Sequence, residues 1–237
     1  MEHDPEQRDG SEPEAIPAGF LATLPVAAAE RLLADTLRID VPSGGTVYRD
    51  DERGRAIVVL HGLLRIYMRS PDGRQVTIRY ARDGEIVGLA LVIDGPAPIT
   101  IQALTGASVV ALRIDALRAM LETDPAVARA CAAELARQLI RAFDEIADQA
   151  FLSVRQRVAR QLLDLAAHTD DGTLVAKVSQ QELADAIASG REVVSRALHE
   201  LQHAGLVSSA HAGIVVSDPV GLSDEASGAT RLAPDSE

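Results

Sequence analysis

The chain has 237 residues, of which 47% are hydrophobic and 24% charged, a size that suits one large domain or two smaller ones. No apolar run approaches the roughly 20 residues that a membrane span needs, and the opening MEHDPEQRDG is acidic, unlike a signal peptide. The single cysteine excludes a disulfide framework and any four-cysteine metal site within one chain. We therefore expect a protein of the reducing cytoplasm that has no membrane partner.

Most of the net charge of −12 lies near the two ends of the chain. Residues 1–19 hold six acids and one arginine (−5), and residues 217–237 hold five acids and one arginine (−4), which together make nine of the twelve charges. Both ends are rich in Pro, Gly and Ser, and this composition predicts disordered tails at 1–19 and 218–237. The acidic total is therefore weak evidence against a polyanionic partner for the folded part.

The chain is expected to have an α+β fold in which residues 20–123 form an effector β-domain. Short helices are predicted over 20–36, and from 37 to about 114 short β-type runs alternate with turn residues. The runs are LRIDV, TVY, AIVVL, LLRIYM, QVTIRYA, EIVGLALVI, ITIQAL and SVVALRI. Strands of this length and spacing predict an antiparallel double-sheet or closed β-structure, because such an arrangement hides the strand edges.

A long helix is predicted over residues 124–150, with Pro125 in its first turn. Apolar residues recur along it at steps of three and four: Val127, Cys131, Leu135, Leu139, Ala142 and Ile146. A helix of this length extends beyond a small β-domain, so the stripe predicts a dimerisation helix that pairs with its twin. Cys131 lies on the stripe, where a lone cysteine is more often a small core residue than a redox switch.

Residues 151–217 have the pattern of a helix-turn-helix followed by a hairpin. A helix is expected at about 152–168. Ser179 and Glu182 form a capping-box pattern that begins a helix over 180–187. A small-residue turn at 188–190 leads to a second helix over about 191–204, and residues 206–216 read as two short strands, a wing. The second helix of such a pair is shaped to enter the major groove of DNA.

The outward face of that second helix carries Arg191, Glu192, Ser195 and Arg196. Arginine can donate two hydrogen bonds to guanine, and glutamate can accept one from cytosine. An ordinary solvated charged face is the alternative interpretation. Because the cap, the turn, the arginine pair and the wing agree with one another, we favour DNA binding.

The chain resembles the CRP/FNR regulators, the family of the cyclic-AMP receptor protein and the fumarate–nitrate reduction regulator. The similarity covers about residues 20–216 and includes REVVSRAL at 191–198 and DGEIVG at 83–88. It implies a cyclic-nucleotide-binding-type jelly roll, a dimerisation helix and a C-terminal winged helix. Carried over by position, Arg191, Glu192 and Arg196 read bases beside Ser195, while Ser179, Gln180 and His211 contact the DNA backbone. Ala188-Ser189-Gly190 departs from the family's Gly-x-Ser.

A second departure concerns the ligand. Cyclic-AMP binders of the family carry a Glu for the ribose hydroxyl and an Arg for the cyclic phosphate, but this chain has Leu89 and the stretch Ala97-Pro98-Ile99 there. Burying a phosphate without a charge partner costs roughly several kcal/mol of binding free energy. We therefore predict that neither cyclic AMP nor cyclic GMP binds. The residues expected to line the effector pocket are Leu89, Ala90, Pro98, Ile99 and Tyr80.

The sequence thus predicts a homodimeric transcriptional regulator that binds palindromic double-stranded DNA and responds to a signal other than cyclic AMP. In the alternative, the β-domain is structural only and DNA binding needs no ligand. An enzyme on a cupin-like barrel is disfavoured because residues 37–114 lack a His-x-His pair or a nucleophile elbow. No metal or cofactor is predicted, His61 included, and the effector stays unidentified. The resemblance also implies RNA polymerase as a candidate partner, through an unassigned surface.

Overall fold

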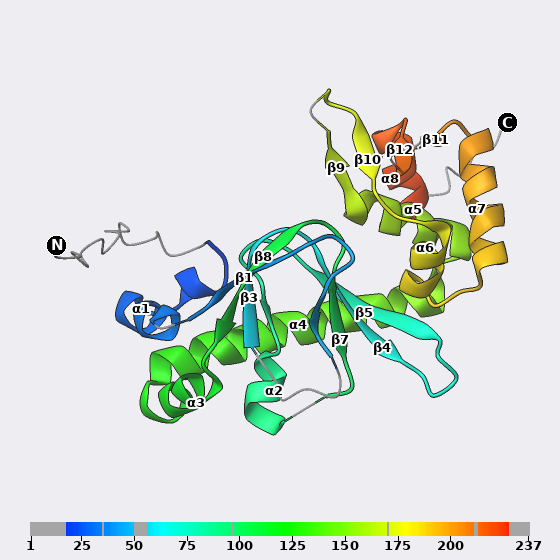
Figure 1. Ribbon diagram of the computed structural model, residues 1–237. Coiled ribbons are helices and arrows are strands. Elements are labelled where there is room, and N and C mark those ends of the chain that lie inside the picture. The colour runs from blue at the N-terminus through cyan, green and yellow to red at the C-terminus, as the bar shows by residue number, and fades with distance from the viewer. Residues whose placement is uncertain are drawn as a thin grey trace, which may run out of the picture.

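The structure, a computed structural model, describes residues 18–34, 36–49, 56–95, 97–169, 171–210 and 213–227. It shows an N-terminal β-domain, a long helix and a C-terminal helical domain with a small sheet (Figure 1). Residues 1–17 and 228–237 of the predicted tails lie outside the described residues, as does His211. None of the described helices has both the length and the apolar character that a membrane span requires.

Within the described residues, the β-domain consists of two four-stranded antiparallel sheets, with orders β1-β8-β3-β6 and β2-β7-β4-β5. The strands are β1 (Arg38–Val41), β2 (Thr46–Tyr48), β3 (Ala56–His61), β4 (Leu64–Arg69), β5 (Gln75–Ala81), β6 (Ile86–Val87), β7 (Thr100–Ala103) and β8 (Ala107–Leu112). Side chains such as Tyr48, Ile57, Leu64 and Ile101 form a core that both sheets line. The predicted antiparallel double-sheet structure is confirmed.

One predicted strand is wrong in its second half. The run EIVGLALVI forms the two-residue strand β6 and then the helix α2 (Leu89–Asp94). Gly88 between them has a φ of 86°, a left-handed conformation that ends the strand. Leu89 and Val92, three positions apart, are then buried on one side of the helix.

A second core lies on the outer face of the sheet β1-β8-β3-β6, where helices cover it. These are the 3₁₀ turn η1 (Leu21–Thr23), α1 (Val26–Leu33), α2, α3 (Ile114–Thr123) and the first turns of α4 (Pro125–Phe151). The predicted short helices over 20–36 are therefore confirmed. Asp124 caps α4 by accepting hydrogen bonds from the backbone N–H groups of Ala126 and Val127, and Pro125 stands in the first turn.

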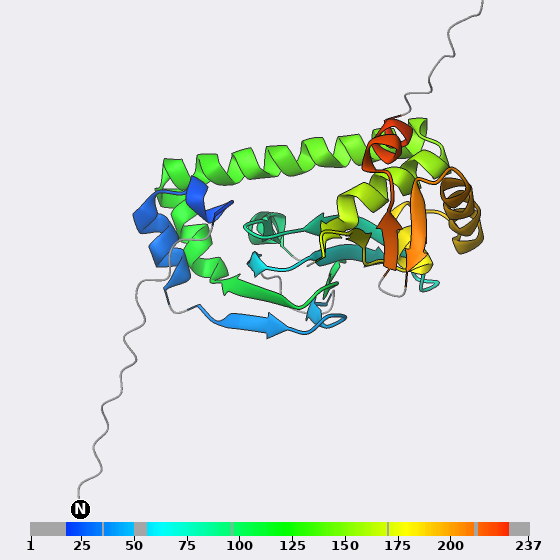
Figure 2. The ribbon, with the colours of Figure 1, turned by 90° about the horizontal axis from the view of Figure 1, so that it is seen from above.

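Helix α4 has 27 residues and runs along the β-domain to the C-terminal domain (Figure 2). Of the predicted stripe, Val127 and Cys131 are buried in the second core of their own chain, and Leu135 packs at its margin. Leu139 and Ile146 are 55% and 63% exposed, on another side of the helix. The stripe is therefore not one face, because each step of four residues turns about 40° past a full helical turn.

The C-terminal domain has its own core, formed by four helices around a sheet of order β11-β12-β10-β9. Its elements are α5 (Val154–Leu165), β9 (Ala166–His168), β10 (Leu174–Ala176), α6 (Gln180–Ala186), α7 (Arg191–His203), β11 (Val207–Ala210), β12 (Gly213–Val216) and α8 (Pro219–Ala226). Helix α5 begins at a capping box formed by Ser153 and Gln156. The predicted helix, turn, helix and wing are all present.

Two expectations for this domain need correction. The helix predicted to reach residue 168 ends at Leu165, and the next three residues form β9, paired with β10. The folded part also extends beyond residue 217, because α8 buries Leu222 completely in the domain core. Asp218 accepts a hydrogen bond from the Gly221 N–H and Pro219 follows it, which is a helix-start signal within the presumed tail.

Candidate nucleic-acid interface

Helix α6 is fixed at its start by a reciprocal pair of hydrogen bonds. The Ser179 hydroxyl accepts from the Glu182 N–H at 3.2 Å, and the Glu182 carboxylate accepts from the Ser179 N–H at 2.7 Å. Leu183 and Ala184 on the opposite side are completely buried. The predicted capping box is confirmed, and it leaves the side chain of Gln180 exposed at the start of the helix.

The turn into α7 contains the residues at which this chain departs from its family's pattern. Ala188 has a φ of 50°, a left-handed conformation that glycine adopts more readily. Gly190 is the N-cap residue of α7 and supplies no side-chain hydrogen bond to the helix. The Ser189 N–H donates to the Ala184 carbonyl at 2.9 Å and closes the turn.

Helix α7 is held by one face and presents the other to solvent. Its inner face is formed by Val194, Ala197, Leu198 and Leu201, all buried. Arg191, Glu192 and Arg196 are exposed, and Ser195 beside them is half-buried. The guanidinium groups of Arg191 and Arg196 form no hydrogen bond or ion pair with another described residue. The structure thus places the four predicted residues together on the outer side of the helix.

The wing stands beside the C-terminal half of this helix. Strands β11 and β12 are antiparallel, with Val207 opposite Val216 and Ala210 opposite Gly213. The Gln202 amide of α7 donates to the Ser209 hydroxyl of β11 at 2.7 Å. A groove of about 740 Å³ lies between α7, the start of α6 and the wing. It is lined by polar groups from all three, including Ser179, Gln180, Ser195, Arg196, His199 and Ser209.

The five residues expected to line an effector pocket do not come together. Leu89 lies in the core under the helices, Ile99 packs against the core between the two sheets, and Tyr80 packs against the core of the C-terminal domain. Ala90 and Pro98 are exposed. The structure therefore places these residues in three different cores and at the surface. Tyr80 takes part in the contact between the two domains.

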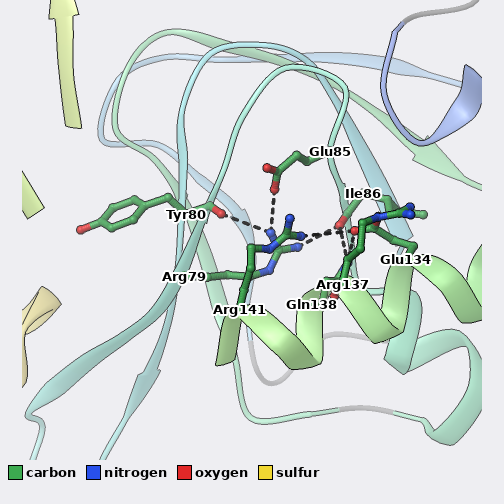
Figure 3. Close-up of polar contacts among 8 residues, drawn as sticks. All are labelled: Arg79, Tyr80, Glu85, Ile86, Glu134, Arg137, Gln138 and Arg141. Carbon is green, nitrogen blue, oxygen red and sulfur yellow. Dashed lines mark hydrogen bonds and ion pairs between the residues drawn. The ribbon is translucent and has the colours of Figure 1, made fainter. Parts of the chain in front are cut away.

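A polar cluster, missed by the sequence analysis, joins α4 to the β-domain (Figure 3). Arg79 of β5 donates to the Glu85 carboxylate at 2.9 Å and to the Ile86 carbonyl at 2.8 Å. Burial lowers the pKa of Arg79, and the Glu85 carboxylate opposes that shift. On α4, Glu134 is 7% exposed and accepts hydrogen bonds from Arg137, Gln138 and Arg141. Glu134, an acid on the same side of the predicted helix as the apolar residues that pack against the β-domain, was the sequence feature that could have indicated this cluster.

Comparison with known proteins agrees with this architecture. A family model described as the Crp-like helix-turn-helix domain matches residues 156–225, and one described as the cyclic nucleotide-binding domain matches residues 38–124. The transcriptional regulator LdrP of Thermus thermophilus is 33% identical over 193 residues, covering 79% of this chain and 96% of that protein. A CRP-like cAMP-activated global transcriptional regulator of Mycobacterium tuberculosis is 29% identical over 208 residues, covering 85% of this chain and 93% of that protein.

Solved structures show the same arrangement. A CRP-family transcriptional regulator from Thermus thermophilus superposes with a TM-score of 0.69 at 32% identity, covering 80% of this chain and 96% of that one. The c-di-GMP-responsive global regulator CLP of Xanthomonas campestris has a TM-score of 0.69 at 25% identity, covering 81% and 99%. These are transcriptional regulators with a helix-turn-helix DNA-binding domain. The chain belongs to the CRP/FNR family of transcriptional regulators.

Proposed function

We propose that the protein is a homodimeric, sequence-specific DNA-binding regulator in which α7 reads the major groove. The carrying observation is the pair of exposed guanidinium groups of Arg191 and Arg196, which have no partner among the described residues. Each can form a bidentate contact with guanine, and Glu192 can accept a hydrogen bond from cytosine. Ser179 and Gln180 at the exposed start of α6 contact the DNA backbone, as does His211, which lies outside the described residues.

The second copy is seated on the exposed face of α4. Six exposed residues, which we call the α4 seam, follow steps of four and three: Ala132, Ala136, Leu139, Phe143, Ile146 and Ala150. This is the spacing by which two helices interlock their side chains in a coiled coil. Leu139, Phe143 and Ile146 are each more than half exposed in the single chain, so pairing removes a large apolar surface from water. The dimer then places two α7 helices in successive major grooves, about 34 Å apart, on a palindromic site.

The signal that controls this dimer is not cyclic AMP. Ala97, Pro98 and Ile99 stand where a cyclic phosphate would need an arginine, and Leu89 at the ribose position is 1% exposed within a core. One relative is described as cAMP-activated and another as responsive to c-di-GMP. The ligand therefore differs among these relatives although the fold is shared. The polar cluster of Figure 3 offers a route by which a change in the β-domain can move α4.

The experiment that tests DNA reading is selection of bound duplexes from a random library by the full chain, followed by gel-shift titration. We expect a palindromic consensus. Arg196→Ala removes one bidentate contact, which costs about 1–3 kcal/mol. Arg129→Ala, which removes the same charge from the exposed side of α4, is the matched control and should leave the affinity unchanged. Unchanged binding by Arg196→Ala would show that the assignment of the reading residues is wrong.

A ligand-independent regulator, in which the β-domain is structural, is the other outcome of this experiment. Repeating the titration with a panel of nucleotides and metabolites distinguishes the two. A ligand that changes the affinity for the selected duplex supports control by a signal. The same affinity throughout the panel supports ligand-independent binding.

A further inference from the structure

The two domains of one chain are joined by a buried ion pair. The Arg65 Nη2 of β4 lies 3.1 Å from the Asp185 Oδ2 of α6, and the two side chains are only 4% and 16% exposed. The partners are 120 residues apart in the sequence. The hairpin β4–β5 lies close to α6 and to the start of α7 in Figure 1, and α6 packs against β5.

Arg65 is held rigidly on its own side of this contact. Its Nε donates to the Thr77 hydroxyl at 2.9 Å, and its Nη1 donates to the Gln75 side chain at 3.0 Å. The guanidinium carbon also lies 4.6 Å from the centre of the Tyr67 ring. Because the β-domain fixes the guanidinium plane, the N–H groups of Nη2 point in fixed directions, and Asp185 must lie in one of them to accept a hydrogen bond.

Asp185 is fixed on the other side, because its second carboxylate oxygen accepts from the Gln181 amide at 2.8 Å. Leu63 and Tyr80 of the β-domain also pack against the core of the C-terminal domain. Apolar packing of this kind has no preferred direction. A fixed donor facing a fixed acceptor, in contrast, specifies one relative orientation of the two domains.

We propose that the Arg65–Asp185 pair is a positioning contact that sets the angle of the winged helix relative to α4, and so the separation of the two recognition helices in the dimer. This rests on the proposed dimeric DNA binding. Once one recognition helix is bound, the other meets its half-site at an effective concentration that depends on how well the geometry matches. Loosening the angle lowers that effective concentration, whereas contact with a single half-site does not depend on the angle.

The test compares the full chain with Asp185→Ala on two duplexes: the selected palindrome, and the same duplex with one half-site scrambled. We expect the variant to lose about tenfold in affinity for the palindrome, the value of one hydrogen bond to a charged group, and nothing for the single half-site. Palindromes with one base pair added or removed at the centre should be discriminated less sharply by the variant. Asp224→Ala, which removes an exposed acid from α8 of the same domain, should leave both affinities and the spacing preference unchanged.

Equal losses on both duplexes would overturn the proposal, because Asp185 would then act on DNA contact or on the fold of its domain. Equal affinities of variant and wild type on both duplexes would overturn it as well. If Asp185→Ala does not fold, as judged by its thermal melting, Asp185→Asn keeps an acceptor oxygen without the charge and should show a smaller loss on the palindrome only. If the wild type binds the palindrome no more tightly than the duplex with one half-site, the proposed dimeric DNA binding is contradicted. The proposed role of the Arg65–Asp185 pair then fails with it.

Discussion

Ala188 shows how a single backbone angle explains the preference of a family pattern for glycine. The resemblance places glycine at this position, and the sequence alone indicates only that alanine replaces it. The structure gives the reason for the preference, because the residue has a φ of 50°, where a Cβ atom is strained. Local signals such as the Ser179–Glu182 capping box were predictable, since they depend on residues three apart. A positive φ at an alanine was not.

Cys131 lies in the core that α4 shares with the β-domain, with its side chain 1% exposed. Burial raises the pKa of its thiol from the usual 9.0 to about 11. We therefore expect almost no reaction of the native protein with a thiol reagent such as DTNB at pH 8, because the reactive species is the thiolate. Full reaction should follow in denaturant. The measurement is the absorbance of the released thiolate over time.

The same shift predicts a pH dependence of stability. Between about pH 9 and 11 the unfolded thiol loses its proton while the folded one keeps it. The folded state then binds more protons, so the free energy of unfolding falls as the pH rises through this window. Cys131→Ser lacks this contribution and serves as the control. In the labelling experiment described above, rapid reaction of the native protein at pH 8 would contradict the buried position of Cys131. It would favour the alternative that this cysteine is a redox switch.

At the scale of elements, the sequence predicted most of the strands and helices, but the stripe predicted on α4 combines residues from two sides of the helix. The apolar residues of α4 form two stripes, one packed against the β-domain and one exposed. The predicted series, which was counted in steps of three and four through Cys131, begins on the first stripe and ends on the second. Helix α2 was missed because a short apolar run does not distinguish a strand from a buried helix. Helix α8 was missed because its two acids and the acidic residue before it suggested a tail, although Asp218 caps the helix and Glu225 pairs with Arg155.

The α4 seam gives a prediction at this scale. Leu139→Glu combined with Phe143→Glu puts two charges from each chain into the proposed coiled-coil contact, where burial without partners is costly. We expect a monomer by sedimentation or light scattering, with helical content unchanged. Gln149→Glu adds a negative charge to an exposed position of α4 outside the seam and should stay dimeric. A double variant that remains dimeric would place the contact between the two chains elsewhere.

At the scale of the whole molecule, the contacts that join the parts were beyond the sequence analysis. Arg65 meets Asp185, Tyr80 packs against the C-terminal core, and the Arg82 guanidinium donates to the Asp164 carbonyl, each across a long stretch of chain. No local pattern marks such pairs, since each needs both domains in place. Tyr80 was therefore assigned to a ligand pocket, where an aromatic residue of a β-strand is a reasonable candidate. Its actual position makes the β-domain a support for the orientation of the winged helix.

The last prediction concerns cyclic AMP and cyclic GMP, to which we expect no response. The cyclic-AMP binders of this family use three side chains for the nucleotide: an acid for the ribose, an arginine for the phosphate and a hydroxyl beside it. Residues 89 and 97–99 of this chain supply none of the three. Without the arginine, the desolvated phosphate has no compensating charge. We expect no heat of binding for cyclic AMP or cyclic GMP by calorimetry, and the same affinity for the selected duplex with and without either nucleotide. Saturable binding that shifts the DNA affinity would mean that other residues, such as the arginines of the polar cluster in Figure 3, hold the phosphate, and Arg79→Gln would then be the variant that abolishes it.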